Sequence, residues 1–117
     1  MNNYKELDIW KRSIKLAVNI YKLTSVLPTE EKFGLVSQLR RCAVSVPSNI
    51  AEGSGRKTNK EFSQFLTIAY GSLCELDTQV IISLELGYLK SNDVQDIEKE
   101  VGELQKMMFA LIQKFSV

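Results

Sequence analysis

The stretch VQDIEKEVGELQKMMFALIQKF, residues 94–115, decides the fold class of this 117-residue chain. Its apolar residues recur at alternating steps of three and four, the spacing of one face of a packed α-helix. They are Val94, Ile97, Val101, Leu104, Met108, Leu111 and Phe115. This repeat predicts helices that cross at about 20°, as in an antiparallel bundle.

The same rhythm occurs in three earlier stretches, so the sequence predicts four helices near residues 7–26, 30–53, 59–86 and 92–115. Their similar lengths and short connections predict one all-α domain over residues 1–117, an up-down-up-down antiparallel four-helix bundle. No strand pattern competes with this interpretation.

Residues that favour helix ends mark the boundaries. Pro28 follows the first helix, and Thr58 with Glu61 has the spacing of a capping box that opens the third. Gly87 suits the left-handed position after that helix, and Ser91 or Asn92 is expected to cap the fourth. Inside the second helix, Pro47 removes a backbone hydrogen bond, which predicts a kink.

Composition and cysteine usage indicate an ordinary intracellular domain. Apolar residues make up 44% and charged residues 25% of the chain. No apolar leader and no long apolar run are visible, which predicts a cytoplasmic protein without a membrane span. Cys42 and Cys74 fit no metal or redox spacing, so we expect both to be reduced and buried.

Charge is distributed unevenly along the chain. Residues 1–60 hold 11 Lys/Arg and 5 Asp/Glu, whereas residues 61–117 hold 4 and 9. The two halves can pair with each other, inside one chain or between subunits.

Two basic clusters lie in the positive half. One stands at the expected N-terminus of the third helix, and the other lies on the first helix. Together they are predicted to bind nucleic-acid phosphates without sequence preference, and the competing interpretation is solvated surface charge. The residues are Arg56, Lys57, Lys60, Lys11, Arg12 and Lys15.

A polar stripe follows the second helix, and a matching polar set lies on the third. Serine and asparagine are poor exposed-helix formers, so the stripe predicts a structural or interface network, and the competing interpretation is a solvated face. Glu75 is expected to pair with Arg41 or Arg40, within the chain or between subunits. The predicted network contains Gln38, Arg40, Arg41, Ser45, Asn49, Glu52, Ser72, Glu75 and Gln79.

The sequence contains no histidine, which removes the common nucleophile systems and the usual zinc sites. Residues 53–58, GSGRKT, lack the spacing of a phosphate-binding loop and have no strand before them. We therefore expect no enzymatic activity, no cofactor and no metal.

Residues 38–53, QLRRCAVSVPSNIAEG, carry a specific resemblance, together with EKFGL at 31–35 and GSLCEL at 71–76. The chain resembles, over nearly its whole length, the four-helix bundle proteins associated with intervening sequences in bacterial 23S ribosomal RNA genes. Cys42 stands where that family more often has alanine. The resemblance implies a four-helix bundle and a ring-shaped homo-oligomer, specifically a pentamer.

Similar proteins accompany diversity-generating retroelements and bind reverse transcriptase and nucleic acid. Residues and resemblance together predict a non-enzymatic, oligomeric nucleic-acid-binding or ribonucleoprotein accessory protein. The alternative is a protein-interaction scaffold whose ring docks a protein partner.

Overall fold

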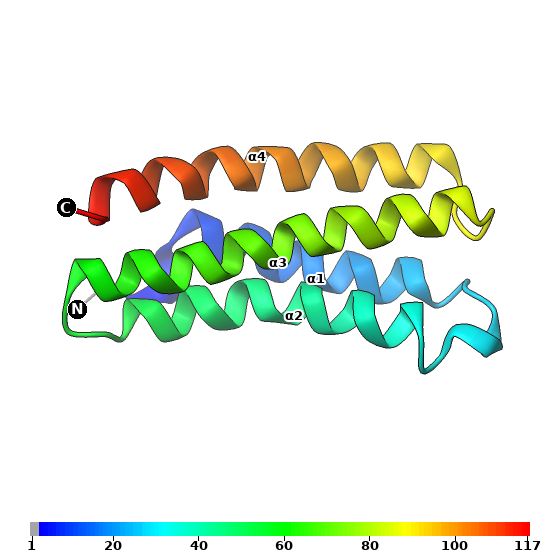
Figure 1. Ribbon diagram of the computed structural model, residues 1–117, viewed down its shortest axis with the longest axis horizontal. Helices are drawn as coiled ribbons and strands as arrows, with labels where there is room; N and C mark the ends of the chain where they lie inside the picture. The colour runs from blue at the N-terminus through cyan, green and yellow to red at the C-terminus, as the bar shows by residue number, and fades with distance from the viewer. Residues whose placement is uncertain (1–2) are drawn as a thin grey trace.

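The computed structural model describes residues 3–117, which form four long α-helices. The helices are α1 (Asp8–Thr24), α2 (Leu35–Ser54), α3 (Asn59–Glu85) and α4 (Ser91–Phe115). Short 3-10 turns, Tyr4–Glu6 and Thr29–Glu31, precede α1 and α2. Successive helices alternate in direction (Figure 1), and no strand occurs within residues 3–117. The predicted up-down-up-down bundle is confirmed.

Two of the three predicted helix caps are present. The Thr58 hydroxyl accepts a bond from the Glu61 amide at 3.1 Å and opens α3. Gly87 has a φ of +80°, the left-handed conformation that ends α3 cheaply only for glycine. At α4 the prediction was wrong: the N-cap is Lys90, which makes no side-chain capping bond, and Ser91 is already helical.

Helix α2 begins five residues later than the sequence predicted. Residues Thr29–Glu31 form their own 3-10 turn after Pro28, and Gly34 leaves the helical path with φ −107° and ψ −112°. Pro47 is buried inside α2, which continues to Ser54. The kink expected at Pro47 stays a prediction.

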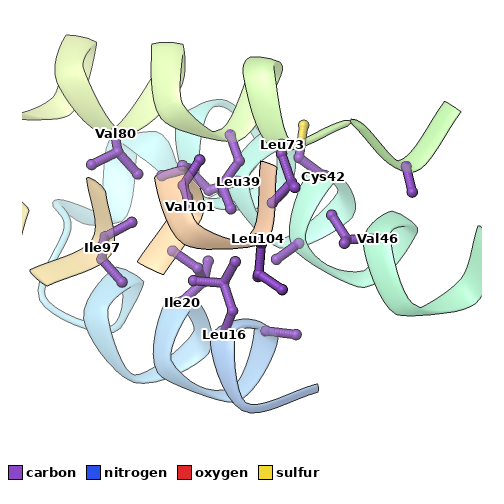
Figure 2. Packing of buried hydrophobic residues seen from close by; sticks show 14 of the residues in the cluster. Leu16, Ile20, Leu39, Cys42, Val46, Leu73, Val80, Ile97, Val101 and Leu104 are labelled. Atoms are coloured by element: carbon purple, nitrogen blue, oxygen red, sulfur yellow. The ribbon is translucent and has the colours of Figure 1, made fainter. Parts of the chain in front are cut away.

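The core is the inward face of all four helices. Figure 2 shows Leu16 and Ile20 of α1 packed near Leu104 of α4, with Leu39 of α2 close by. In α4 the decisive repeat is buried from Val94 to Met108, as predicted. Replacing one such buried side chain with alanine typically lowers the free energy of unfolding by about 2–5 kcal/mol. Packing of this core therefore holds the four helices in their mutual positions.

A tight contact joins α2 to α3 near their connection. A Cβ atom on Gly53 would lie 2.6 Å from Cβ of Phe65 and 2.9 Å from Cδ1 of Phe62. Only glycine lets the two backbones approach this closely, so Gly53 sets the spacing at this end of the bundle.

Helix α3 qualifies the expectation that no segment is apolar enough to cross a membrane. By length and composition, Asn59–Glu85 is long and apolar enough to cross a membrane, because an 18-residue stretch of it has a mean hydropathy of 1.2. Its inward residues, including Leu66, Leu73 and Val80, are fully buried in the bundle. The core packing accounts for part of this apolar composition, whereas Ile68 and Ile82 of the same helix are exposed.

Candidate functional site

The predicted basic loop lies at the same end of the bundle as both chain ends (Figure 1). Lys57 and Lys60 are exposed, and neither forms an ion pair within residues 3–117. Arg56 is partly held, because its guanidinium lies 4.6 Å from the Phe65 ring and 3.5 Å from Glu52 Oε1. The free cations of this loop are therefore the two lysines.

The predicted cations of α1 divide into two groups. Lys11 and Lys15 are exposed. Arg12 instead binds Glu100 of α4 through Nε and Nη2, at 2.8 and 2.9 Å, and approaches Glu103 at 3.4 Å. Its hydrogen bond to Glu100 raises the pKa of Arg12. The basic and acidic halves of the chain thus pair internally here, which separates Arg12 from the predicted phosphate-binding set.

Part of the predicted polar network joins α2 to α3. The hydroxyls of Ser45 and Ser72 lie 2.8 Å apart, and the Asn49 amide donates to the Ser45 carbonyl and hydroxyl at 2.8 and 3.0 Å. Ser72 is buried and Ser45 is half-buried. The structure therefore brings these three predicted residues together within one chain.

The two arginines of the network point elsewhere. Arg40 turns toward α1, where its Nε donates to Thr24 Oγ1 at 2.9 Å and its guanidinium lies 4.6 Å from the Tyr21 ring. Arg41 and Glu75 are both exposed, and no bond joins them within the described chain. The expected intrachain pair of Glu75 with an arginine is therefore absent. Gln38 and Glu52 are exposed as well.

A thiol occupies the place beside Glu75. Cys42 Sγ lies 3.4 Å from Glu75 Oε2 and 3.7 Å from Gln79 Oε1. Burial, with the neighbouring Glu75 carboxylate, raises the pKa of Cys42 to about 11. Cys42 is buried as predicted, but the prediction for Cys74 was wrong, because Cys74 is exposed and accepts a bond from Gln105 Nε2 at 3.5 Å.

An apolar groove of about 550 Å³, which was not predicted from the sequence, lies between α1 and α2. Val18 and Tyr21 of α1 and Val44 of α2 line it with 48%, 44% and 43% of their surfaces exposed. Ile14, Val18 and Tyr21 form a second apolar row beside the core row of α1, at steps of four and three. This second row is the signal that could have predicted the groove.

Helix α3 carries an outward row of its own. Ile68 and Ile82 are 53% and 43% exposed, and Gly71, Glu75 and Thr78 lie between them at alternating steps of three and four. No atom lies within 4 Å of the position a Cβ would take on Gly71. The row therefore presents an apolar side chain at each end, with open space at Gly71 beside Ile68 and the polar Glu75 and Thr78 between them.

These features define an antiparallel four-helix bundle with two unlike apolar surfaces and a lysine-bearing end. Within residues 3–117, no group of three His, Cys, Asp or Glu side chains is placed to hold a metal. The chain belongs to the family of 23S rRNA-intervening sequence proteins, whose family model matches residues 5–110.

The fold recurs in the crystal structure of a protein of unknown function from the S23 ribosomal protein family of Bacteroides thetaiotaomicron VPI-5482. That structure superposes with a TM-score of 0.80 over 89% of this chain and 97% of the other, at 21% sequence identity. Likeness at this identity shows the shared fold alone. No curated protein matches the sequence.

Proposed function

We propose that this chain is a non-enzymatic, cytoplasmic accessory protein that assembles into a homo-oligomer and binds nucleic acid through the assembly. The observation that carries the proposal is the apolar groove between α1 and α2, which leaves Val18, Tyr21 and Val44 substantially exposed in a single chain. Contiguous exposed apolar surface of this kind marks interaction sites.

The occupant of the groove is a second copy of the chain. The outward row of α3, with the exposed Ile68 and Ile82 on either side of Glu75 and Thr78, offers a ridge on a different helix from the groove. When one surface of a subunit meets an unlike surface of the next, the contact repeats head to tail and closes into a ring if the rotation allows. This arrangement agrees with the pentamer that the sequence resemblance implies.

Nucleic-acid binding is supported by the exposed lysines at the α2–α3 connection. Lys57 and Lys60 are free of ion pairs within the described residues, and they precede or begin a long helix. Phosphate contacts by such side chains are individually weak and salt-sensitive. A ring repeats them once per subunit, so several weak contacts act on one strand and raise the overall affinity.

The assembly is tested with two variants that each damage one surface. Val18→Glu places a charge in the groove, and Ile82→Glu places one on the ridge, so each variant alone should be monomeric by light scattering, near 13.3 kDa. A one-to-one mixture should form a dimer and nothing larger, because each variant keeps one intact surface. Phe109→Glu, at an exposed position of α4, is the control and should leave the assembly unchanged.

A wild-type chain that stays monomeric at micromolar concentration contradicts the assembly. If Val18→Glu dissociates it while Ile82→Glu does not, the groove is used but the α3 ridge is not its occupant.

Nucleic-acid binding is tested by fluorescence anisotropy of labelled RNA and DNA at 50 and 200 mM salt. Lys57→Gln with Lys60→Gln should weaken binding and flatten its salt dependence. The matched control is Lys99→Gln with Lys106→Gln, which removes the same charge from exposed positions of α4. Absence of wild-type binding at 50 mM salt overturns this function.

The second candidate is a protein-interaction scaffold, which the apolar character of the same groove favours. A protein partner would bind with an affinity that changes little with salt, in contrast to a phosphate-bearing ligand. Loss of that partner with Val18→Glu, in a chain that binds no nucleic acid, would support the scaffold.

A further inference from the structure

We propose that a second groove, at the start of α2, binds the unpaired bases and phosphates of a single-stranded nucleic acid. This inference rests on the proposed nucleic-acid binding and adds a site that distinguishes a single strand from a duplex. The site, here named the Phe33 groove, has a volume of about 600 Å³. Lys32, Phe33, Arg40 and Arg41 line it, and it shares Tyr21 and Val44 with the apolar groove between α1 and α2.

Phe33 supplies a flat apolar surface that the fold leaves uncovered. Its side chain is 89% exposed, whereas Phe62 and Phe115 stack on each other with ring centroids 5.4 Å apart. Phe33 lies between the Thr29–Glu31 turn and the first residue of α2, in the connection at the far end of the bundle from the chain termini (Figure 1). An exposed aromatic ring held between two ordered elements is suited to stacking on a base.

Three cations line the groove, and one of them, Lys32, contacts this ring. Lys32 Nζ lies 5.5 Å from the Phe33 centroid. Arg40 is held in place by the Tyr21 ring at 4.6 Å and by bonds to Thr24 Oγ1 and the Tyr21 carbonyl, at 2.9 and 3.3 Å. Arg41 is exposed and forms no ion pair within residues 3–117.

The charge of the groove has a single sign. Three cations and no carboxylate line it, whereas Asp93, Asp96 and Glu100 line the grooves between α1 and α4. Glu30 and Glu31 lie in the preceding turn but do not line the groove, and the Glu31 carboxylate accepts bonds from the Leu35 amide and the Tyr88 hydroxyl, both at 3.2 Å. A polyanion is therefore the ligand that the groove attracts.

The aromatic ring favours a single-stranded polyanion over a duplex. Bases in a duplex are stacked and paired, so an exposed phenyl ring cannot reach their faces, whereas a single strand offers every base for stacking. No asparagine, glutamine or carboxylate side chain lines the groove, and its arginines serve the phosphates, so little sequence preference is expected. The groove therefore combines backbone contacts from the cations with a base contact from Phe33.

The experiment compares a labelled oligouridylate with an RNA duplex of equal length. Phe33→Ala should weaken single-strand binding roughly 5- to 100-fold, the effect of losing one aromatic stacking contact, and should leave duplex binding unchanged. Phe33→Tyr keeps the ring and should bind like wild type. Arg41→Gln should lower the affinity for both ligands and reduce the salt dependence of binding.

Phe109→Ala and Lys106→Gln provide matched controls, because they remove an exposed ring and an exposed cation from α4. Both should bind like wild type. Assembly size is measured for every variant by light scattering.

The possible results separate this inference from the proposed function. If wild type binds neither ligand, the proposed nucleic-acid function fails and the groove proposal fails with it. If wild type binds, and Phe33→Ala binds the single strand equally well while the Lys57/Lys60 variant does not, only the groove proposal is overturned. Equal weakening of the duplex, or dissociation of the assembly by Phe33→Ala, also overturns it, since the ring would then act other than by base stacking.

Discussion

The guanidinium of Arg12 on α1 binds both carboxylate oxygens of Glu100 on α4, Nε to Oε1 at 2.8 Å and Nη2 to Oε2 at 2.9 Å. The remaining nitrogen, Nη1, lies 3.2 Å from Met107 Sδ. This ion pair joins the first helix to the last, two helices with no direct connection in the chain. The side chains of Arg12 and Glu100 are 35% and 31% exposed, so solvent screens the attraction in part.

Arg12→Ala should lower the free energy of unfolding by about 0.5–1 kcal/mol, the upper range for a partly exposed ion pair with bidentate geometry. Urea denaturation of the single and double variants with Glu100→Gln gives the coupling energy directly. The Arg56–Glu52 pair, at 3.5 Å and more exposed, is the comparison and should show almost no coupling. A coupling of zero for Arg12 and Glu100 would contradict this prediction.

Gly53→Ala should destabilise the fold by about 1–3 kcal/mol, because the added methyl meets Phe65 Cβ at 2.6 Å and the crowded backbones must separate. Gly102→Ala is the control, since its Cβ meets no atom within 4 Å and lies inside α4. That substitution should stabilise by about 0.5–1 kcal/mol through helix propensity. Thermal melts of both variants should move in opposite directions.

Gly71→Ala separates chain stability from assembly. It shares with Gly102→Ala a helical position with open space around the new methyl, so both should stabilise the isolated chain by about 0.5–1 kcal/mol. Only Gly71 lies in the outward row of α3, where the added methyl fills the open space beside Ile68. Light scattering should show weaker association for Gly71→Ala alone; identical association of the two variants would count against the α3 ridge.

Cys42 should make stability fall at alkaline pH. The pKa of its thiol rises from an ordinary 9.0 to about 11 in the folded protein, mainly through burial. The unfolded thiol then loses its proton first, so stability contributed by Cys42 is complete below pH 9 and is lost as pH rises toward 11. Melting temperatures of wild type and Cys42→Ala should converge or cross over this window; parallel curves would refute the assignment.

The two cysteines should differ in reactivity. Cys74 is exposed, whereas Cys42 is buried with a raised pKa and so offers little thiolate at neutral pH. Iodoacetamide at pH 8 should therefore modify Cys74 completely before Cys42 reacts, as read from peptide mass spectra. Urea should remove the difference, and equal rates in the native protein would show that Cys42 is accessible.

The helices were predictable because their evidence is local and repeated. The α4 row from Val94 to Met108, the Thr58 cap and the left-handed Gly87 each follow from neighbours within a few residues. The start of α2 was misplaced because the Thr29–Glu31 turn has a helix-like composition but hydrogen bonds of a 3-10 turn. Cys74 follows the buried Leu73 by about 100° around the helix, which carries it out to the surface.

The candidate sites were less predictable, because periodicity gives the direction of a Cα–Cβ bond and not the partner of a long side chain. Arg40 and Arg41 are adjacent, yet one packs on Tyr21 and the other points to solvent. Arg12 looked like part of a free basic patch until the fold placed Glu100 beside it. The second apolar row of α1 indicates an apolar surface there, but that α2 forms the other wall of the groove follows only from the fold.

The order of the helices also has a kinetic consequence. Neighbouring helices in the sequence are neighbours in space, so each antiparallel hairpin forms from nearby segments, and such local topologies fold fast. The exception is the α1–α4 seam, where contacts such as Arg12–Glu100 span most of the chain. Closing that seam costs the most chain entropy, so we expect it to form late in folding and to be the first part of the bundle to exchange its amide hydrogens.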